Sequence, residues 1–321
     1  MAEPILIDTD TASDDAVALI MALRSRGADV IAITTVAGNV AIEQATRNAL
    51  YTAELCGAST PVYQGAAQPL TRRLAIADWF HGRDGLGDHG YPPPSRDPEK
   101  QHAVEAIISL ARSNPGLLLV TLGPLTNIAL ALAQAPDLAR HVGRCVVMGG
   151  APGCVGNVTP AAEYNMWVDP EAARIVFHSG LPIEMVGWQL CRGAAVIGPA
   201  DIEFIEGIGT KLARFAIECN STARQAFRAQ TGEDGISLPD PVAMSIALDP
   251  SIGIEWSRHY VDIETASELT RGMTVVDQLN VAGNERNRAI WSDLLRREPN
   301  AKVCWAIDAP RWKQALYSAL R

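Results

Sequence analysis

The sequence predicts a single α/β domain with a mostly parallel, Rossmann-like central sheet flanked by helices. Over residues 4–187, short apolar runs typical of buried strands alternate with segments whose apolar residues recur at helical spacing. This alternation favours parallel strands joined by right-handed crossovers, with helices on both faces. A chain of 321 residues that is 48% hydrophobic and 20% charged is ordinary for a globular protein with one large core. We therefore expect one domain over residues 1–321.

The elements follow in order along the chain. Pro4–Asp8 is an apolar run before a polar turn, and Asp14–Arg26 has helical periodicity that Gly27 ends. Further strands are expected at Val30–Val36, Leu117–Leu122, Cys145–Met148 and Ile183–Gly187. Further helices are expected at about Ala41–Gly57, His102–Asn114, Leu125–Ala135 and Pro170–Ser179. Ligands of such sheets bind where the strands end, so functional residues are expected at the carboxyl edge.

Two segments interrupt this alternation. The loop Gln68–Lys100 is rich in Gly, Pro, Asp and His, and the stretch Asp201–Asp249 is mainly helical in pattern. Long loops without regular structure inside compact domains are often lids, although a plain surface excursion is equally consistent with the composition. Either segment could cover a site at the edge of the sheet.

Composition excludes several classes of protein. The formal net charge of -9, without a dense run of Lys and Arg, argues against a nucleic-acid groove. No apolar run reaches the roughly 18 residues of a membrane span, and the start of the chain lacks a basic region before a long apolar stretch. The six cysteines are scattered without a CxxC motif, so we expect buried, reduced thiols. These features predict a cytoplasmic protein with small-molecule partners and no membrane contact.

Four carboxylates lie within one strand-to-helix loop, at Asp8, Asp10, Asp14 and Asp15. Carboxylates a few ångströms apart repel and raise one another's pKa unless a cation neutralises them, and hard divalent ions prefer oxygen ligands. The loop therefore predicts a Ca²⁺ or Mg²⁺ site. The alternative is that Ser13 or Asp14 caps the helix while the other acids complement its dipole, which suits one or two acids but not four.

Two known signatures compete for this loop. An EF-hand needs Gly at its sixth position and Glu at its twelfth, and counting from Asp8 these are Ser13 and Leu19, so the EF-hand is excluded. The two aspartates of the DxDxT signature of haloacid-dehalogenase-like phosphatases are matched by Asp8 and Asp10 after an apolar strand, with Thr11 one position before the Thr of the signature. A Mg²⁺-dependent phosphatase would also need a downstream Lys and a further acidic pair, for which the chain has no convincing candidates.

Five motifs then occur in order over about 160 residues. They are DTDTASDDA at 8–16, VAGNV at 36–40, HGRDGL at 81–86, LGPLTNIA at 122–129 and, after MGG at 148–150, GNVTPAAEYN at 156–165. Together they resemble the inosine-uridine preferring nucleoside hydrolase family, the ribonucleoside hydrolases. Each motif alone is a weak signal, whereas five in order are specific. The resemblance implies hydrolysis of the N-glycosidic bond of ribonucleosides to free base and ribose.

The resemblance also implies roles for particular residues. Asp10, Asp15, the Leu122 main-chain carbonyl and Asp240 would hold a Ca²⁺, and Asp10 would take the proton of the attacking water. The remaining implied residues contact the substrate, namely Asp14 at the 2′-hydroxyl, Asn157 and Glu163 at the 5′-hydroxyl, Asn165 at the ribose hydroxyls near the developing cation, Asn39 near the water, and Met148. Family members are usually dimers or tetramers, so a homodimer or homotetramer is implied.

Bland alternatives exist for some of these residues. Taken alone, each Asn is more often a turn residue, and Asp240 before Pro241 is a typical helix cap. A cap still has a free oxygen, so capping and metal binding by Asp240 are compatible. The predicted layout also suits the chemistry, because an oxocarbenium-like transition state needs negative charge and oxygen dipoles around the sugar and water at C1′.

The chain departs from the family pattern at Pro239. Broad-specificity members carry a His before the residue matching Asp240, and purine-specific members carry a Trp, whereas Pro can neither donate a proton nor present a wide aromatic face. Activation of the leaving base must therefore come from elsewhere or be weak. The candidates are His81 in its matched motif, Trp79, His89 and Tyr91 in the same loop, and Phe227.

These candidates favour purine nucleosides. An aromatic loop that stacks a purine would let N7 take its proton from solvent, whereas a pyrimidine needs a positioned acid. Pro239 also keeps open a second alternative, a non-catalytic protein that binds calcium and ribose. Trp188, just after the strand Ile183–Gly187, has no physical explanation from the sequence.

Overall fold

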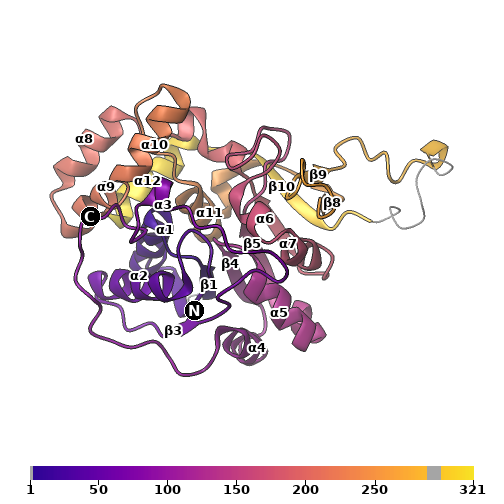
Figure 1. Cartoon of the computed structure of the whole chain (residues 1–321), viewed down its shortest axis with the longest axis horizontal. Helices are drawn as coiled ribbons and strands as arrows, with labels where there is room; N and C mark the ends of the chain where they lie inside the picture. Colours follow the sequence, from indigo (N-terminus) through magenta and orange to yellow (C-terminus); the bar gives the residue numbers. More distant parts are fainter. Residues whose placement is uncertain (1–2, 288–297) are drawn as a thin grey trace.

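The central feature of the computed structural model, which describes residues 3–287 and 298–321, is an eight-stranded sheet (Figure 1). Its strand order is β3-β2-β1-β4-β5-β6-β10-β7, and the pairs are parallel except for the antiparallel pair β10–β7. The strands are β1 (Glu3–Thr9), β2 (Ala28–Thr35), β3 (Val62–Gln64), β4 (Leu117–Thr121), β5 (Val142–Met148), β6 (Ile183–Val186), β7 (Gly253–His259) and β10 (Ala301–Ile307). The predicted α/β architecture is confirmed.

Helices cover both faces of the sheet, and β1 shows why. Ile5 and Ile7 point into one apolar cluster while Leu6 points into the other, because successive side chains of a strand face opposite sides. One cluster packs under α1 (Ser13–Arg24), α2 (Ile42–Leu55), α11 (Pro239–Leu248) and α12 (Ala309–Ala319). The other packs under α4 (Ala103–Ser113), α5 (Thr126–Gln134) and α7 (Pro170–Phe177).

The expected helical stretch 201–249 consists of α8 (Pro199–Ile208), α9 (Lys211–Glu218), α10 (Ser221–Thr231) and α11. In Figure 1, α8, α9 and α10 gather at one end of the molecule, and α10 contacts the short helix α3 (Asp78–His81). Two smaller elements also matter below: α6 (Tyr164–Val168) and the two-stranded sheet of β8 (Val261–Ile263) and β9 (Thr274–Val276).

The loop 68–100 contains α3 and is otherwise almost without regular structure. It is tied to the domain at several points. The Leu70 N–H donates to Asp169 (2.8 Å), and Arg72 pairs with Glu171. Farther along, the Ser95 N–H donates to Glu54 on α2. The loop is therefore anchored on both sides of α3, and only α3 and its neighbours approach the site described below.

Two further expectations concern cysteines and membranes. All six cysteines are free, and Cys145, Cys191, Cys219 and Cys304 are buried. Among the described residues, no helix combines the length and apolar character that a membrane crossing requires.

Candidate active site

The predicted motifs meet at the carboxyl edge of the sheet because their strands are parallel neighbours. The loop after β1 is fixed to its neighbours by the Val36 N–H donating to the Thr9 carbonyl (3.0 Å) and the Leu122 N–H donating to the Asp8 carbonyl (2.8 Å). The loops after β2, β4 and β5 thus surround the start of α1. Parallel pairing places these separate motifs around one point.

The carboxylates of Asp14, Asp15 and Asp240 form a compact buried group, in which one oxygen of each lies within 4.8 Å of the others. Asp15 is held by the Thr9 hydroxyl (2.5 Å) and by the Ala12 N–H (2.9 Å). Asp240 lies in the first turn of α11, which packs against α1. Two helix starts therefore bring acids together from distant parts of the sequence.

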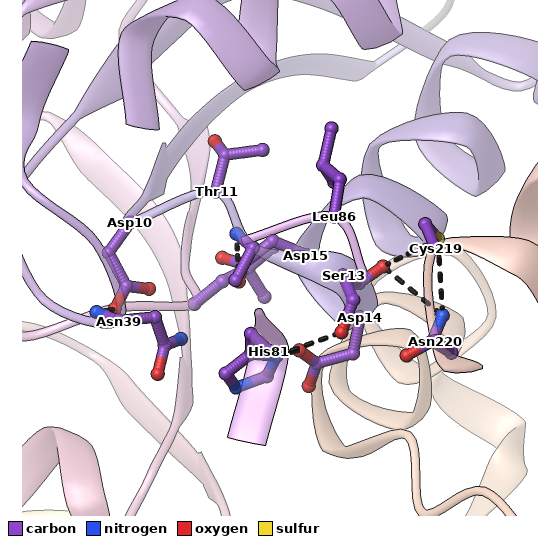
Figure 2. A network of polar contacts seen from close by, with 12 residues as sticks. Asp10, Thr11, Ser13, Asp14, Asp15, Asn39, His81, Leu86, Cys219 and Asn220 are labelled. Carbon is purple, nitrogen blue, oxygen red and sulfur yellow. Dashed lines mark hydrogen bonds and ion pairs between the residues drawn. The ribbon is translucent and has the colours of Figure 1, made fainter. Parts of the chain in front are cut away.

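Asp10 lies beside this group and interacts with the Asp15 carboxyl. Its Oδ2 accepts the Asn39 N–H at 2.6 Å, while its Oδ1 is buried without a hydrogen-bond partner (Figure 2). The backbone of Gly123 passes so close that an added Cβ would lie 2.7 Å from Asp10 Oδ1. The 38–39 turn and Gly123 thus fix the direction of this carboxylate.

Burial and mutual repulsion raise the pKa of these acids. Burial, with the charge of Asp15, raises the pKa of Asp14 to about 8. Burial and the neighbouring carboxylates hold the pKa of Asp10 and of Asp240 well above the ordinary range. Asp10 Oδ1 and Asp14 Oδ1 are both buried without partners. Repelling carboxylates with unpartnered oxygens are the donor set of a hard divalent cation, so these residues fit such an ion.

The geometry differs from the predicted metal set in one member. Among the described residues, the compact triad contains Asp14 where the prediction placed Asp10. The reason is that Asp10 Oδ2 is turned toward the Asn39 N–H, whereas Asp14 and Asp15 both start α1 and face Asp240. The predicted fourth ligand, the Leu122 carbonyl, accepts the Asn165 amide at 2.8 Å and retains a second lone pair.

The loop before α6 arranges the predicted ribose-binding residues. Glu163 caps α6, with Oε1 accepting the Asn165 N–H and Oε2 accepting the Gly150 N–H, each at 2.8 Å. Asn157 Oδ1 accepts the Tyr164 N–H at 2.9 Å. Backbone N–H groups thus hold the side chains of Glu163 and Asn157, which fixes the directions in which their remaining lone pairs and N–H groups point.

A cavity of about 650 Å³, counting its open mouth, adjoins the acids. The predicted site residues that line it are Asp14, Asn39, Trp79, His81, Leu122, Met148, Asn157, Glu163, Asn165 and Asp240. Asp10 and Asp15 are fully buried and are not among the lining residues. The lining therefore combines carboxylates, amides and aromatic side chains around one opening.

Three of the residues proposed for the base lie elsewhere. Phe227 is buried and does not line the cavity, because α10 turns the face of Ala223 and Phe227 inward. His89 bonds Ser221 at 2.9 Å, and Tyr91 stacks on Tyr51 with ring centroids 5.3 Å apart. These placements correct the prediction that they contact the base.

His81 and Trp79, by contrast, line the cavity from α3. Trp79 is 56% exposed, so it lies at the mouth. His81 is buried, and its Nδ1 lies 2.8 Å from the Ser13 hydroxyl and 3.8 Å from Asp14 Oδ1. Burial lowers the pKa of His81 to about 3, so its ring is neutral near pH 7.

Several residues line the cavity without having been predicted to do so, namely Ala77, Phe80, Val158, Tyr164, Trp188, Gln230, Ser237 and Pro239. Trp188 follows β6 at the carboxyl edge of the sheet, and this position in the sequence could have indicated that it lines the cavity. The hydroxyl of Ser237 donates to the Cys191 carbonyl (3.0 Å), which ties the start of α11 to the turn after β6. Trp188 and Pro239 therefore face the same cavity.

Asp8 has a supporting position. It is fully buried, accepts the Thr34 hydroxyl (2.6 Å) and the Asn127 amide (2.8 Å), and does not line the cavity. Burial raises its pKa to about 7. A phosphatase of the DxDxT type would need this residue as its exposed nucleophile, and the position argues against that alternative.

Comparison with known proteins agrees with this geometry. A family model described as inosine-uridine preferring nucleoside hydrolase matches residues 5–314. The pyrimidine-specific ribonucleoside hydrolase RihA of Klebsiella pneumoniae subsp. pneumoniae is 41% identical to this chain, over 92% of this chain and 95% of that protein.

Solved structures show the same likeness. The plant nucleoside hydrolase PpNRh1 superposes with a TM-score of 0.91 at 34% identity, covering 100% of this chain and 99% of that one. The purine-preferring ribonucleoside hydrolase from Gardnerella vaginalis superposes with a TM-score of 0.87 at 29% identity, covering 99% and 98%. The names of these relatives include both pyrimidine-specific and purine-preferring enzymes.

Proposed function

The chain belongs to the inosine-uridine preferring nucleoside hydrolase family, whose members hydrolyse the N-glycosidic bond of ribonucleosides, and we propose that it does so with Ca²⁺ and prefers purine nucleosides. The observation that carries the proposal is the group of buried, mutually repelling carboxylates beside an open cavity lined by amide and aromatic side chains. Family membership makes the alternative of a non-catalytic calcium and ribose binder unnecessary.

The proposed ion site keeps the predicted ligands Asp10, Asp15, Asp240 and the Leu122 carbonyl, because Asp10 interacts with the Asp15 carboxyl and its Oδ1 is buried without a partner. Asp14, which also belongs to the compact group, lines the cavity and would contact both the ion site and the ribose. An all-oxygen set supplied mainly by the protein favours Ca²⁺, because Mg²⁺ usually keeps several waters. When bound, the ion would acidify a water molecule and fix the two secondary hydroxyls of ribose. Asp10 would then accept the proton of the attacking water through its unpartnered Oδ1.

The ribose would be held by the loop before α6. Asn157 uses its Oδ1 on the Tyr164 N–H, so its amide N–H groups remain to donate to the 5′-hydroxyl. Asn165 uses its amide nitrogen on the Leu122 carbonyl, so its oxygen remains for the sugar and its developing positive charge. Glu163 would accept from the 5′-hydroxyl, Asp14 would accept from the 2′-hydroxyl, and Asn39 and Met148 would complete the contacts.

The preference for purines rests on the base end of the cavity. Trp79, Phe80 and Trp188 supply aromatic faces there, and His81 is the one histidine among the described lining residues. Pro239 occupies the position where an acid would serve a pyrimidine. Stacking and protonation from solvent suit a purine better. The names of the RihA relatives point to pyrimidines instead, which makes the base preference a direct experimental question.

The test is hydrolysis of inosine, adenosine, guanosine, uridine and cytidine by protein stripped of metal, with Ca²⁺, Mg²⁺ or chelator added. We expect Ca²⁺ to restore release of free base and ribose, with higher kcat/KM for the purine nucleosides. Restoration by Mg²⁺ alone would contradict the choice of ion. Equal or faster cleavage of uridine would contradict the purine preference, and no cleavage of any of the five would contradict the activity.

We also propose a cytoplasmic homodimer or homotetramer. Family membership is the support for the assembly. Sedimentation velocity would test the assembly, and cell fractionation would test the location. A monomer at micromolar concentration would contradict the first proposal.

A further inference from the structure

Ser13 and His81 make a contact that the roles above do not use. The Ser13 Oγ and His81 Nδ1 lie 2.8 Å apart, with Ser13 fully buried and His81 lining the cavity (Figure 2). We propose that Ser13 is a positioning residue for the reaction. Its hydroxyl donates to His81 Nδ1, which fixes the tautomer that carries its proton on Nε2 and offers that N–H to the leaving base. The proposal rests on the nucleoside hydrolase function proposed above.

The direction of the hydrogen bond follows from what each partner would otherwise lack. If His81 Nδ1 carried the proton and donated it to Ser13, the Ser13 hydroxyl would be a buried donor with no other acceptor among the described residues. A buried unpaired donor is costly. Asp14 Oδ1 lies 3.8 Å from His81 Nδ1, which is too far for it to replace Ser13 as the hydrogen-bond partner of that nitrogen. Donation by Ser13 satisfies the hydroxyl and leaves Nε2 as the protonated nitrogen.

Both partners are fixed in place. Ser13 is the first residue of α1, and its carbonyl accepts the Asn220 amide (3.4 Å) and the Cys219 thiol (3.5 Å) from the junction of α9 and α10 (Figure 2). His81 ends α3, with its N–H donating to the Ala77 carbonyl (3.0 Å) and its carbonyl accepting the Gly87 N–H (2.9 Å). Because both backbones are held and the Ser13 side chain is fully buried, the contact orients the imidazole relative to the cavity.

The chemical role follows from the bond that breaks. When the C1′–N bond cleaves, its electron pair leaves with the base, and a hydrogen bond from His81 Nε2–H stabilises the charge that develops there. The water oxygen bonds to C1′, its proton passes to Asp10, and the proton that completes the free base comes from solvent. His81 therefore acts as a hydrogen-bond donor and keeps its own proton through the cycle.

Steady-state kinetics on two kinds of leaving group test the proposal. With inosine, Ser13→Ala should lower kcat about tenfold, the effect of losing one hydrogen bond, and leave KM nearly unchanged. With p-nitrophenyl β-D-ribofuranoside, whose leaving group needs no donor, the variant should retain the wild-type kcat. Equal losses on both substrates would mean a merely structural role and would overturn the proposal.

Two further variants sharpen the reading. His81→Gln places an amide N–H near the position of Nε2, so it should retain more activity on inosine than His81→Ala. Ser221→Ala is the matched control, because Ser221 also starts a helix and bonds a histidine ring, His89 Nε2 at 2.9 Å, outside the cavity. Ser221→Ala should leave kcat unchanged for both substrates. Equal inactivity of the two His81 variants would count against a donor role.

A readout independent of activity is the tautomer itself. Nitrogen-15 NMR of the resting protein labelled at histidine should show the His81 proton on Nε2, with the resonance assigned by its loss in His81→Gln. In Ser13→Ala the signal should shift toward a mixture of tautomers. A proton on Nδ1 in the wild-type protein would overturn the proposal even if nucleosides are cleaved. Failure to cleave any nucleoside would instead refute the proposed function.

Discussion

Pro239 decides what the base end of the cavity can do. It is the first residue of α11, directly before Asp240, and it faces the same cavity as Trp188. A proline at the start of a helix is stable, because its missing N–H has no partner there in any case. The position therefore stabilises the start of α11, and in the proposed function Trp188 would stack on the base and His81 would donate a hydrogen bond to it.

Replacing Pro239 with His should restore an acid at this position. We expect Pro239→His to raise kcat for uridine about 10²-fold while changing kcat for inosine much less, because a pyrimidine depends on a positioned proton donor. The measurement is the ratio of kcat values for the two substrates. Pro239→Ala controls for the loss of proline and should leave the ratio unchanged. An unaltered ratio in Pro239→His would show that leaving-group protonation does not limit uridine cleavage.

Asp10 is the residue whose loss should stop the chemistry without harming the fold. In Asp10→Asn, the side-chain oxygen can still accept the Asn39 N–H, but no general base remains. We expect kcat to fall by about 10³-fold or more, with the thermal transition of the metal-free protein unchanged or raised because a buried, repelling carboxylate is gone. Asp8→Asn should retain base release. If Asp8→Asn abolished base release and Asp10→Asn did not, Asp8 would be supported as a nucleophile instead.

At the scale of elements, hydrophobic periodicity was sufficient for the strongly patterned half of the chain. The strands β1, β2, β4, β5 and β6 and the helices α1, α2, α4, α5 and α7 lie within a few residues of prediction. The strands β3, β7 and β10 were not anticipated. β3 has three residues, and β7 is an edge strand with mostly half-exposed side chains, so neither has the apolar run by which buried strands are recognised.

The site was predictable where its residues adjoin strands with recognisable motifs. Asp14, Asn165 and Asp240 line the cavity, and so do Trp188 and Gln230, to which the sequence assigned no role. Phe227 was proposed because it is aromatic, yet on an amphipathic helix the large apolar residue turns inward, and Gln230 of the same helix lines the cavity. Which face of α10 meets the cavity depends on packing against α3, and a single sequence does not contain that information directly.

Gly123 shows how an element boundary supports the site. An added Cβ there would lie 2.7 Å from Asp10 Oδ1 and 2.9 Å from the Asp10 backbone nitrogen. Because the nearest backbone atom cannot move without shifting β1, Gly123→Ala should destabilise the protein by roughly 1–3 kcal/mol and lower kcat more than tenfold. Chemical denaturation and steady-state kinetics would measure the two effects.

The matched control is Gly207 in α8, where an added Cβ meets no atom within 4 Å. Gly207→Ala should stabilise the protein by about 0.4–1 kcal/mol, because alanine restricts the unfolded chain, and should leave kcat unchanged. A Gly123→Ala variant as stable and active as Gly207→Ala would show that the close approach of Asp10 and Gly123 is not needed.

For the whole molecule, the buried acids connect stability, pH and metal binding. In the metal-free protein the pKa of Asp14 is raised to about 8 and that of Asp8 to about 7, so between pH 6.5 and 8.5 the folded state holds protons that the unfolded chain has lost. Stability must therefore fall as pH rises through this interval. The lowered pKa of His81 has the opposite sign, but it acts only below its ordinary value of 6.5.

We expect the Tm of metal-free protein to fall by roughly 2–4 °C from pH 6.5 to 8.5, measured by scanning calorimetry with chelator present. Saturating Ca²⁺ should raise Tm more at pH 8.5 than at pH 6.5, because binding must displace protons at the lower pH. Asp14→Asn should flatten the metal-free dependence. Asp137→Asn, at an exposed acid whose pKa Arg112 lowers to about 2, should not. If the Tm of metal-free protein rose with pH, or Ca²⁺ stabilised it equally at both values, the carboxylates could not be the ion's ligands.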